Sequence, residues 1–386
     1  MTMLGSCDTG NLSGLHEGPR MAKSTAVRAA ARFKQFCCFG LDREAVIPAL
    51  LNELHAIIPS FCNSFLFADE TGVLVNAYLE NTETMKLYPL YQQEFREGRE
   101  REFKGFAFSD VARTQVGPQD FRSTVSVDQT TFHRSDLYNL VIRPAGNDSN
   151  FLRFHFRDGG RVLGGLTMWR STGASEWTAE EKRRLVSLES FFIHALTARD
   201  SSETALVDSD AIGLVIANTA GKPLYFSAEG RRLLYLATSL QGSAGTLANR
   251  STVLPTPVVQ LCRSLFQIFS DDTSASAPIY HHSNAWGGFT FRAQWLDQDD
   301  PTSGLIGITI SHKVPLPIRL MRSVQKLPLS RRQAEVCVLM ATGASNEVVA
   351  ERLGISAHTV NEHGRWIYNK LDVHSRAELV SKLLSN

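Results

Sequence analysis

Hydrogen-bonding side chains that could recognise another molecule gather in one short stretch near the end of the chain. Asn361, Glu362 and Arg365 lie on the polar side of a predicted helix, 356–370, whose other side is apolar. Asparagine donates and accepts hydrogen bonds, ionised glutamate accepts them, and arginine donates them in a fixed fork. The chemistry open to this stretch is therefore recognition of a polar partner by hydrogen bonds.

Four short helices are predicted to position this stretch, within a small all-α unit over 325–386. A serine precedes each helix as its cap: Ser330, Ser345, Ser356 and Ser375. Gln333 and Glu378 would complete capping boxes, and Gly343 and Gly354 would end the first two helices. Apolar residues at helical spacing are expected to face a common core: Ala334, Cys337, Val338, Ala341, Val348, Val349, Leu353, Val360, Gly364, Ile367, Leu371, Leu379, Val380 and Leu383.

The segment GASNEVVAERLGISAHTVNEHGRWIYNKLDVHSR resembles the LuxR/FixJ-type (GerE-like) helix-turn-helix DNA-binding domain. Glu335 also matches an acidic residue on the first helix of that family. The positions in register are Gly343, Ser345, Asn346, Ala350, Leu353, Ser356, Thr359, Val360, His363, Ile367, Lys370, Leu371, Val373, Ser375 and Arg376.

The resemblance implies that the third helix of the unit enters the major groove of duplex DNA. By their match to family positions, three residues are expected to contact base edges: Asn361, Glu362 and Arg365. Five others are expected to contact phosphates and so set the register on DNA: Ser345, Asn346, Thr359, Lys370 and Arg376.

The resemblance also implies a homodimer on DNA, with the protomers meeting at the fourth helix. That helix carries Leu379, Leu383 and Leu384, which is more apolar surface than a small bundle needs. A two-fold dimer would bind inverted half-sites about one helical turn apart.

The terminal unit departs from the family at one place, where Asn361 replaces the usual lysine and acidic Glu362 follows it. Residues 326–386 contain eight basic and six acidic side chains, so their net charge is only +2. Weak non-specific DNA binding is expected, and base contacts or dimerisation must add affinity. The alternative is an interaction protein whose helical unit titrates other regulators without binding DNA. Arg365, Lys370 and Thr359 favour DNA binding, whereas Asn361 and Glu362 leave the alternative open.

Residues 25–200 are expected to form an α+β unit that resembles a GAF domain in the order of its elements. A helix is predicted over 43–58, and hairpins over 63–79 and 150–169. The strand 151–157 alternates between two faces. One face has Phe151, Arg153, His155 and Arg157, and the other, apolar face has Leu152, Phe154 and Phe156. One closing helix is predicted to begin at the Thr178–Glu181 capping box, with its apolar stripe at Leu185, Leu188, Phe191, Phe192 and Leu196.

Residues 205–315 are expected to form a second α+β unit that resembles a PAS domain. Its predicted elements are a hairpin over 213–227, helices over 228–237 and 258–269, and a final hairpin over 287–312. The two units share a general plan of sheet and helices. Both are expected to be sensory, gating the terminal unit in response to a small-molecule effector or a partner.

Three shorter features complete the expected organisation. Residues 1–24, rich in Gly, Ser, Thr and charge, are expected to form a flexible tail. His281 and His282 are expected in a solvated loop and not as metal ligands. Pro315 and Pro317 are expected to mark a stiff linker into the terminal unit.

The composition is that of a soluble globular protein, with 43% hydrophobic and 20% charged residues. We expect a cytoplasmic protein, because there is no apolar run of membrane-spanning length and no secretory h-region. The scattered cysteines fit a reduced compartment. The pair Cys37–Cys38 is expected to be one buried and one surface thiol, with a redox switch as the alternative. No phosphate loop, GxSxG, HExxH or kinase motif occurs, so we expect no enzyme, cofactor or metal.

Overall fold

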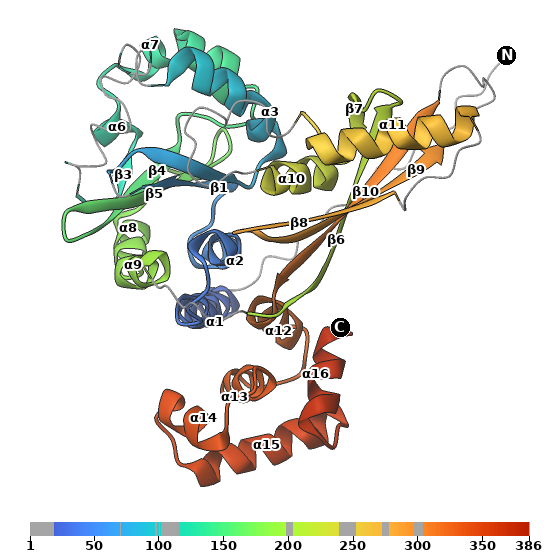
Figure 1. Cartoon of the computed structure of the whole chain (residues 1–386). Coiled ribbons are helices and arrows are strands. Elements are labelled where there is room, and N and C mark those ends of the chain that lie inside the picture. The colour runs from blue at the N-terminus through green and yellow to red at the C-terminus, as the bar shows by residue number, and fades with distance from the viewer. Residues whose placement is uncertain are drawn as a thin grey trace, which may run out of the picture.

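Two antiparallel sheets and a C-terminal group of helices make up the chain (Figure 1). The structure is a computed structural model that describes residues 19–69, 71–96, 99, 101, 114, 116–197, 204–238, 252–271, 278–296 and 304–385. Of the helices in these ranges, none has the length and hydropathy that crossing a bilayer requires.

The first unit is a five-stranded sheet of order β2-β1-β5-β4-β3, with helices on both faces. Its elements are α1 (Pro19–Cys37), α2 (Arg43–Ile57), β1 (Cys62–Ala68), β2 (Leu74–Leu79), α3 (Thr82–Leu90), π-helix η1 (Tyr91–Phe95), β3 (Gln119–Asp120), α6 (Phe121–Thr124), α7 (Gln129–Arg134), π-helix η2 (Tyr138–Ile142), β4 (Phe151–Asp158), β5 (Arg161–Trp169), α8 (Ala179–Val186) and α9 (Glu189–Thr197). The predicted helix 43–58 and both predicted hairpins are confirmed.

Three expectations for the first unit need correction. Helix α1 begins at Pro19 and so extends into the expected tail; proline is well suited to a first helical turn. The closing helix is two helices, because the N–H of Leu188 bonds to the Leu185 carbonyl and tightens the chain there. Both faces of β4 are buried, Arg153 and His155 included, since a second apolar cluster around Phe95 and Phe132 lies beside the sheet.

The prediction that Cys37 and Cys38 are one buried and one surface thiol is confirmed. Cys37 is buried at the end of α1, and Cys38 is exposed. Burial raises the pKa of the Cys37 thiol far above its usual value, which leaves it unreactive at neutral pH.

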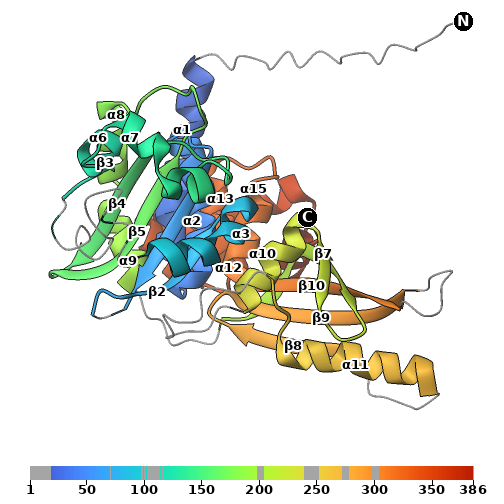
Figure 2. The same cartoon turned by 90° about the horizontal axis from the view of Figure 1, so that it is seen from above.

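The second unit repeats the strand order of the first, as its order is β7-β6-β10-β9-β8. In both sheets the second, first, fifth, fourth and third strands of the unit lie side by side, which supports the shared plan. Its elements are β6 (Leu206–Asn218), β7 (Pro223–Phe226), α10 (Ala228–Ala237), α11 (Thr256–Asp271), β8 (Ile279–Asn284), β9 (Gly287–Leu296) and β10 (Leu305–Pro315). Helix α11 lies along the outer side of the sheet, beside β8 and β9 (Figure 2).

His281 and His282 lie on the edge strand β8 and not in a loop, so that expectation was wrong. His281 Nδ1 lies 3.0 Å from the Thr290 hydroxyl of the neighbouring strand. The signal was weak because the strand Ile279–Asn284 is polar at most positions and borders solvent on one edge.

Helix α10 fixes the second unit against the first. It lies on β6 where Gly213 and Gly230 meet, and a Cβ on Gly213 would collide with the Gly230 backbone. From the same helix, the buried Tyr235 donates to the Ala77 carbonyl of β2 at 3.0 Å. The two sheets therefore share a packed and hydrogen-bonded contact.

The expected stiff linker is a helix, α12 (Leu316–Val324), and this corrects the sequence analysis. Pro315 caps α12 and Pro317 lies in its first turn, where proline costs no hydrogen bond. Helices α13 (Arg331–Ala341), α14 (Asn346–Leu353), α15 (Ala357–Leu371) and α16 (Arg376–Leu384) follow as predicted.

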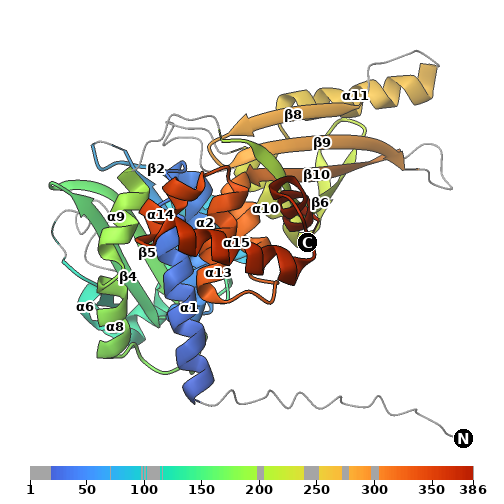
Figure 3. The same ribbon diagram turned by 90° about the horizontal axis from the view of Figure 1, so that it is seen from below.

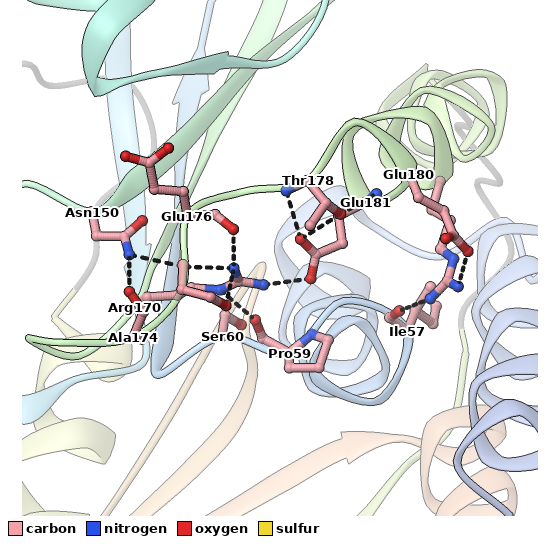
Figure 4. Close-up of polar contacts among 12 residues, drawn as sticks. Ile57, Pro59, Ser60, Asn150, Arg170, Ala174, Glu176, Thr178, Glu180 and Glu181 are labelled. Carbon is pink, nitrogen blue, oxygen red and sulfur yellow. Dashed lines mark hydrogen bonds and ion pairs between the residues drawn. The ribbon is translucent and has the colours of Figure 1, made fainter. Parts of the chain in front are cut away.

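A buried arginine ties the first sheet to α8 (Figure 4). Arg170, which follows β5, forms an ion pair with Glu181 and lies 3.9 Å from the centre of the Trp177 ring. Glu181 also accepts from the N–H of Thr178, which confirms the capping box. Burial opposes ionisation of Glu181, but the hydrogen bonds from Thr178 and Arg170 outweigh it and lower the pKa of this carboxyl. The other Arg170 bonds go to the carbonyls of Pro59, Ser175 and Glu176.

Removing this guanidinium should destabilise the first unit strongly. We expect Arg170→Ala to lower the free energy of unfolding by about 3–5 kcal/mol, because Glu181 and three carbonyls lose a buried partner. Arg122→Ala is the control, since Arg122 pairs with Glu176 while both side chains are exposed, and should cost less than about 1 kcal/mol. Urea unfolding followed by tryptophan fluorescence measures both. Equal losses in the two variants would show that Arg170 is not a structural tie.

Candidate nucleic-acid interface

Serine caps define the helices of the terminal unit, as the sequence predicted. Each of the four serines accepts from a backbone N–H three residues on. Gln333 completes the capping box with Ser330, but Glu378 bonds to the N–H of His374 and not to that of Ser375. The second expected box is therefore only half formed.

The buried side of α15 is the predicted one. Val360, Gly364, Ile367 and Leu371 are its buried residues, packed towards α13 and α14. Four of the other expected core residues are only half-buried: Ala334, Val348, Leu353 and Val380. Gly354 ends α14 in the left-handed conformation, which makes the turn into α15 possible.

The opposite side of α15 is open. In Figure 1 this helix lies at the edge of the molecule farthest from the two sheets, with α13 between it and α12. Seen from below, α15 faces the viewer (Figure 3). Asn361 and Arg365 are exposed on it, and Glu362 is half-buried. The described part of the chain therefore leaves room for a partner as large as a duplex along this helix.

A groove of about 470 Å³ gathers most of the expected contact residues. Asn361 Oδ1 accepts from Asn346 Nδ2 at 2.6 Å, which joins α15 to the start of α14. Arg376 donates to the Ala344 carbonyl at 2.9 Å and to Asn346 Oδ1 at 3.5 Å. Arg365 forms a 3.1 Å ion pair with Glu362 on the same helix. The structure thus brings the three expected base-contacting residues together with Asn346 and Arg376.

Three expected phosphate contacts lie outside this groove. Ser345 and Thr359 are at helix starts, where the Thr359 hydroxyl lies 2.8 Å from that of Ser356. Lys370 is at the far end of α15, where its amine bonds to the Pro328 carbonyl at 3.3 Å and to Gln333 Oε1 at 3.1 Å. Lys370 therefore holds the segment before α13 in this structure.

Sequence reasoning missed Trp366, which is 58% exposed on α15 beside Arg365. A signal was present, because residue 366 falls off the buried stripe of Val360, Gly364 and Ile367. An exposed tryptophan on an otherwise polar helix face is a candidate contact for a partner.

The apolar surface that we expected on α16 is already covered. Leu379 and Leu383 are fully buried, and α16 packs against α12 within the same chain. Leu384 is half-buried, and its carbonyl accepts from Arg319 of α12 at 3.2 Å. The argument for a dimer from spare apolar surface on this helix was therefore wrong.

Comparisons with known proteins bear on this unit. Residues 327–383 match the family described as bacterial regulatory proteins of the luxR family. A putative HTH-type transcriptional regulator of Aeromonas salmonicida is 39% identical over 66 residues, which are 17% of this chain and 34% of that protein. The oxygen regulatory protein NreC of Staphylococcus haemolyticus is 43% identical over 56 residues, which are 14% of this chain and 26% of that protein. The chain thus spans about a third or less of these relatives.

Solved structures resemble the chain only distantly. A Vibrio cholerae VqmA dimer is 14% identical with a TM-score of 0.16, over 46% of this chain and 84% of that one. The Escherichia coli DhaR(N)–DhaL complex is 15% identical with a TM-score of 0.23, over 76% of this chain and 90% of that one. Such scores support no argument about ligand or assembly. The family match does settle the terminal unit: residues 327–383 form a LuxR-type helix-turn-helix domain.

Proposed function

We propose that this chain is a transcriptional regulator that binds duplex DNA through α15. The observation that carries the proposal is the groove in which Asn361, Glu362 and Arg365 meet Asn346 and Arg376 on the open side of a LuxR-type domain. A helix of 15 residues is about 22 Å long and fits the major groove. The Aeromonas salmonicida relative that matches this domain is named a putative HTH-type transcriptional regulator, which supports the same function.

Specific contacts follow from the positions of the side chains. Asn361 and Arg365 are exposed on α15 and would contact base edges, with Glu362 accepting from a neighbouring cytosine. Ser345, Asn346, Thr359 and Arg376 would contact phosphates on either side of the groove. Lys370 would contribute only if it left its bonds to Pro328 and Gln333.

We propose that the two sheet units are GAF-like and PAS-like sensors that gate the terminal unit in the cytoplasm. The support is α12, which follows directly on β10 and packs against both α13 and α16. An effector can shift this regulator only if it binds one arrangement of the units better than another.

We also propose dimerisation on DNA, although the apolar residues of α16 are buried within the chain in this structure. Leu379 and Leu383 are buried where α16 packs against α12 and α13, so they could face a second protomer only after α16 moves from these helices. We therefore propose that contact with α12 opposes dimerisation, and that activation releases α16.

A second candidate function is a non-DNA-binding interaction protein that titrates other regulators. The exposed Trp366 favours it, as does the ion pair of Arg365 with Glu362, which reduces the free positive charge on α15. A gel shift with the full chain, genomic fragments and low salt separates the two functions. DNA binding predicts that a subset of fragments is retained against unrelated competitor DNA, and titration predicts that none is.

Arg365→Ala should reduce base discrimination. We expect a loss of about 1–3 kcal/mol at one base pair of the operator, because the fork of arginine donates two bonds to guanine. The matched control is Arg352→Ala, which removes the same charge from the exposed side of α14 outside the groove. Competition binding on a panel of single-base operator variants measures the effect. Equal loss on every sequence would make Arg365 a phosphate contact.

Lys370→Ala should act differently. Because its amine holds Pro328 and Gln333, we expect it to lower the thermal transition of the terminal unit and leave the base preference unchanged. A decrease of about one in the slope of log affinity against log salt, at unchanged stability, would instead place Lys370 on a phosphate.

Footprinting tests the dimer. We expect two chains to protect inverted half-sites about one helical turn apart, since a two-fold dimer mirrors a palindromic site. Protection of one isolated half-site by a single chain would contradict dimeric binding.

A further inference from the structure

A cavity of about 750 Å³ lies where the first unit, the second unit and α12 meet. Its wall includes residues of α2 and β2 from the first unit, of β6 and α10 from the second, and Ile318 and Arg322 of α12. Small-molecule sites have volumes of roughly 300–1,000 Å³ and favour the interfaces between domains. Both its size and its position therefore suit a ligand.

Two guanidinium groups, those of Arg232 and Arg322, line this cavity. Arg232 of α10 pairs with Glu229 at 2.5 Å. Arg322 of α12 has no ion-pair or hydrogen-bond partner among the residues that the structure describes, although its side chain is open to solvent within the cavity. Desolvation lowers the pKa of Arg322; Tyr78 and Glu53 oppose this, and the nearby Arg232 and Arg319 add to it. Arginine nevertheless stays charged in proteins, so Arg322 brings to the cavity a positive charge without an ion-pair partner among the described residues.

The other titratable groups of the wall form no pair with Arg322. Glu80 is engaged by His55 at 2.8 Å and by the N–H of Asn63 at 2.6 Å. Burial lowers the pKa of His312 to about 4. The positive charges of Arg232 and Arg322 also lower this pKa, whereas the hydrogen bond to the Trp286 carbonyl raises it. His312 is thus neutral at pH 7, and a bound anion would give Arg322 an ion-pair partner.

An unused hydrogen-bond donor lies in the same wall. Trp286 is 3% exposed, and its indole N–H has no acceptor among the described residues. A buried donor without an acceptor costs about 1–3 kcal/mol, which a ligand oxygen would recover. The Trp286 and Tyr78 ring centroids lie 5.7 Å apart, and the two aromatic residues form an apolar part of the same wall as the two arginines.

We propose that this cavity binds a small aromatic anion, with its carboxylate or phosphate held by Arg232 and Arg322. The fork of arginine donors matches both groups. The ring of the ligand would lie against Tyr78 and Trp286, and the indole N–H would donate to a ligand oxygen. The effect of the ligand on regulation rests on the proposed function. A ligand bound to Arg322 would contact α12 directly and would bias the packing of α12 against α13 and α16.

Calorimetric titration of the full chain with benzoate, phenyl phosphate and the neutral benzamide tests the site. We expect one anion per chain, with benzamide about tenfold or more weaker, because it has no charge for Arg322. Tighter binding of benzoate or of phenyl phosphate identifies the anionic group. Equal affinity for benzamide, or no binding of either anion at millimolar concentration, would overturn the proposal.

Two variants locate the site. Arg322→Gln should weaken anion binding about tenfold or more, and Trp286→Phe about two- to tenfold, since it removes the N–H and part of the ring but keeps an aromatic side chain. Arg263→Gln, the same change on the exposed side of α11, is the matched control and should bind as the unaltered chain does. Thermal melts check that each variant is folded. Undiminished binding by folded Arg322→Gln would place the anion elsewhere and refute the assignment.

The readout needs no DNA, so it separates this inference from the proposed function. A chain that shifts DNA but binds no anion contradicts only the cavity assignment. A chain that binds the anion through Arg322 but shifts no DNA contradicts only the regulator.

Discussion

The structure depends on the packing of one nine-residue helix, α12, which is buried on nearly every side. Ile318, Leu320, Met321, Ser323 and Val324 are each at most 4% exposed. The partners of the helix are β6 and β10 of the second sheet on one side and α13 and α16 of the terminal unit on the other. Because packed interiors deform little, a shift of α12 against the sheet must also change its contact with the DNA-binding unit.

A single charged side chain joins these partners. Arg319, which is 5% exposed, pairs with Asp210 at 2.5 Å and donates to the Leu384 carbonyl of α16. Asp210 lies at an irregularity of β6 with a positive φ of 61°, a conformation that aspartate tolerates better than most residues. The irregular strand, the helix and the end of α16 are therefore linked through one guanidinium. Arg322, one turn on, faces the cavity between the units.

Local signals were sufficient to predict the terminal unit. Its serine caps, glycine stops and helical apolar spacing are short-range features, and the hairpins at 63–79 and 213–227 were equally readable from alternation and turns. What the sequence did not reveal depends on distant contacts. The polar residues Arg153 and His155 are buried beside a second apolar cluster around Phe132, and α16 is covered by α12 as well as by α13 of its own unit.

The candidate sites divide in the same way. Asn361 and Arg365 could be predicted from their helix and family register, whereas the ties of Lys370 to Pro328 and Gln333 needed the fold. The cavity could not be predicted at all, since Tyr78, Arg232 and Arg322 lie far apart in the chain. Helix α12 was not predicted, because Pro315 and Pro317 were interpreted as an extended linker. Both prolines lie at the start of this helix, where proline is compatible with helical structure.

The affinity of the Arg319→Ala variant for an operator tests the role of α12 most directly. Arg319 lies away from α15, so the substitution removes no expected DNA contact but loosens α12 from α16. If this contact opposes DNA binding, the variant should bind about fivefold or more tightly than the unaltered chain, in the range of typical allosteric couplings. Unchanged or weaker binding by a folded variant would contradict the account.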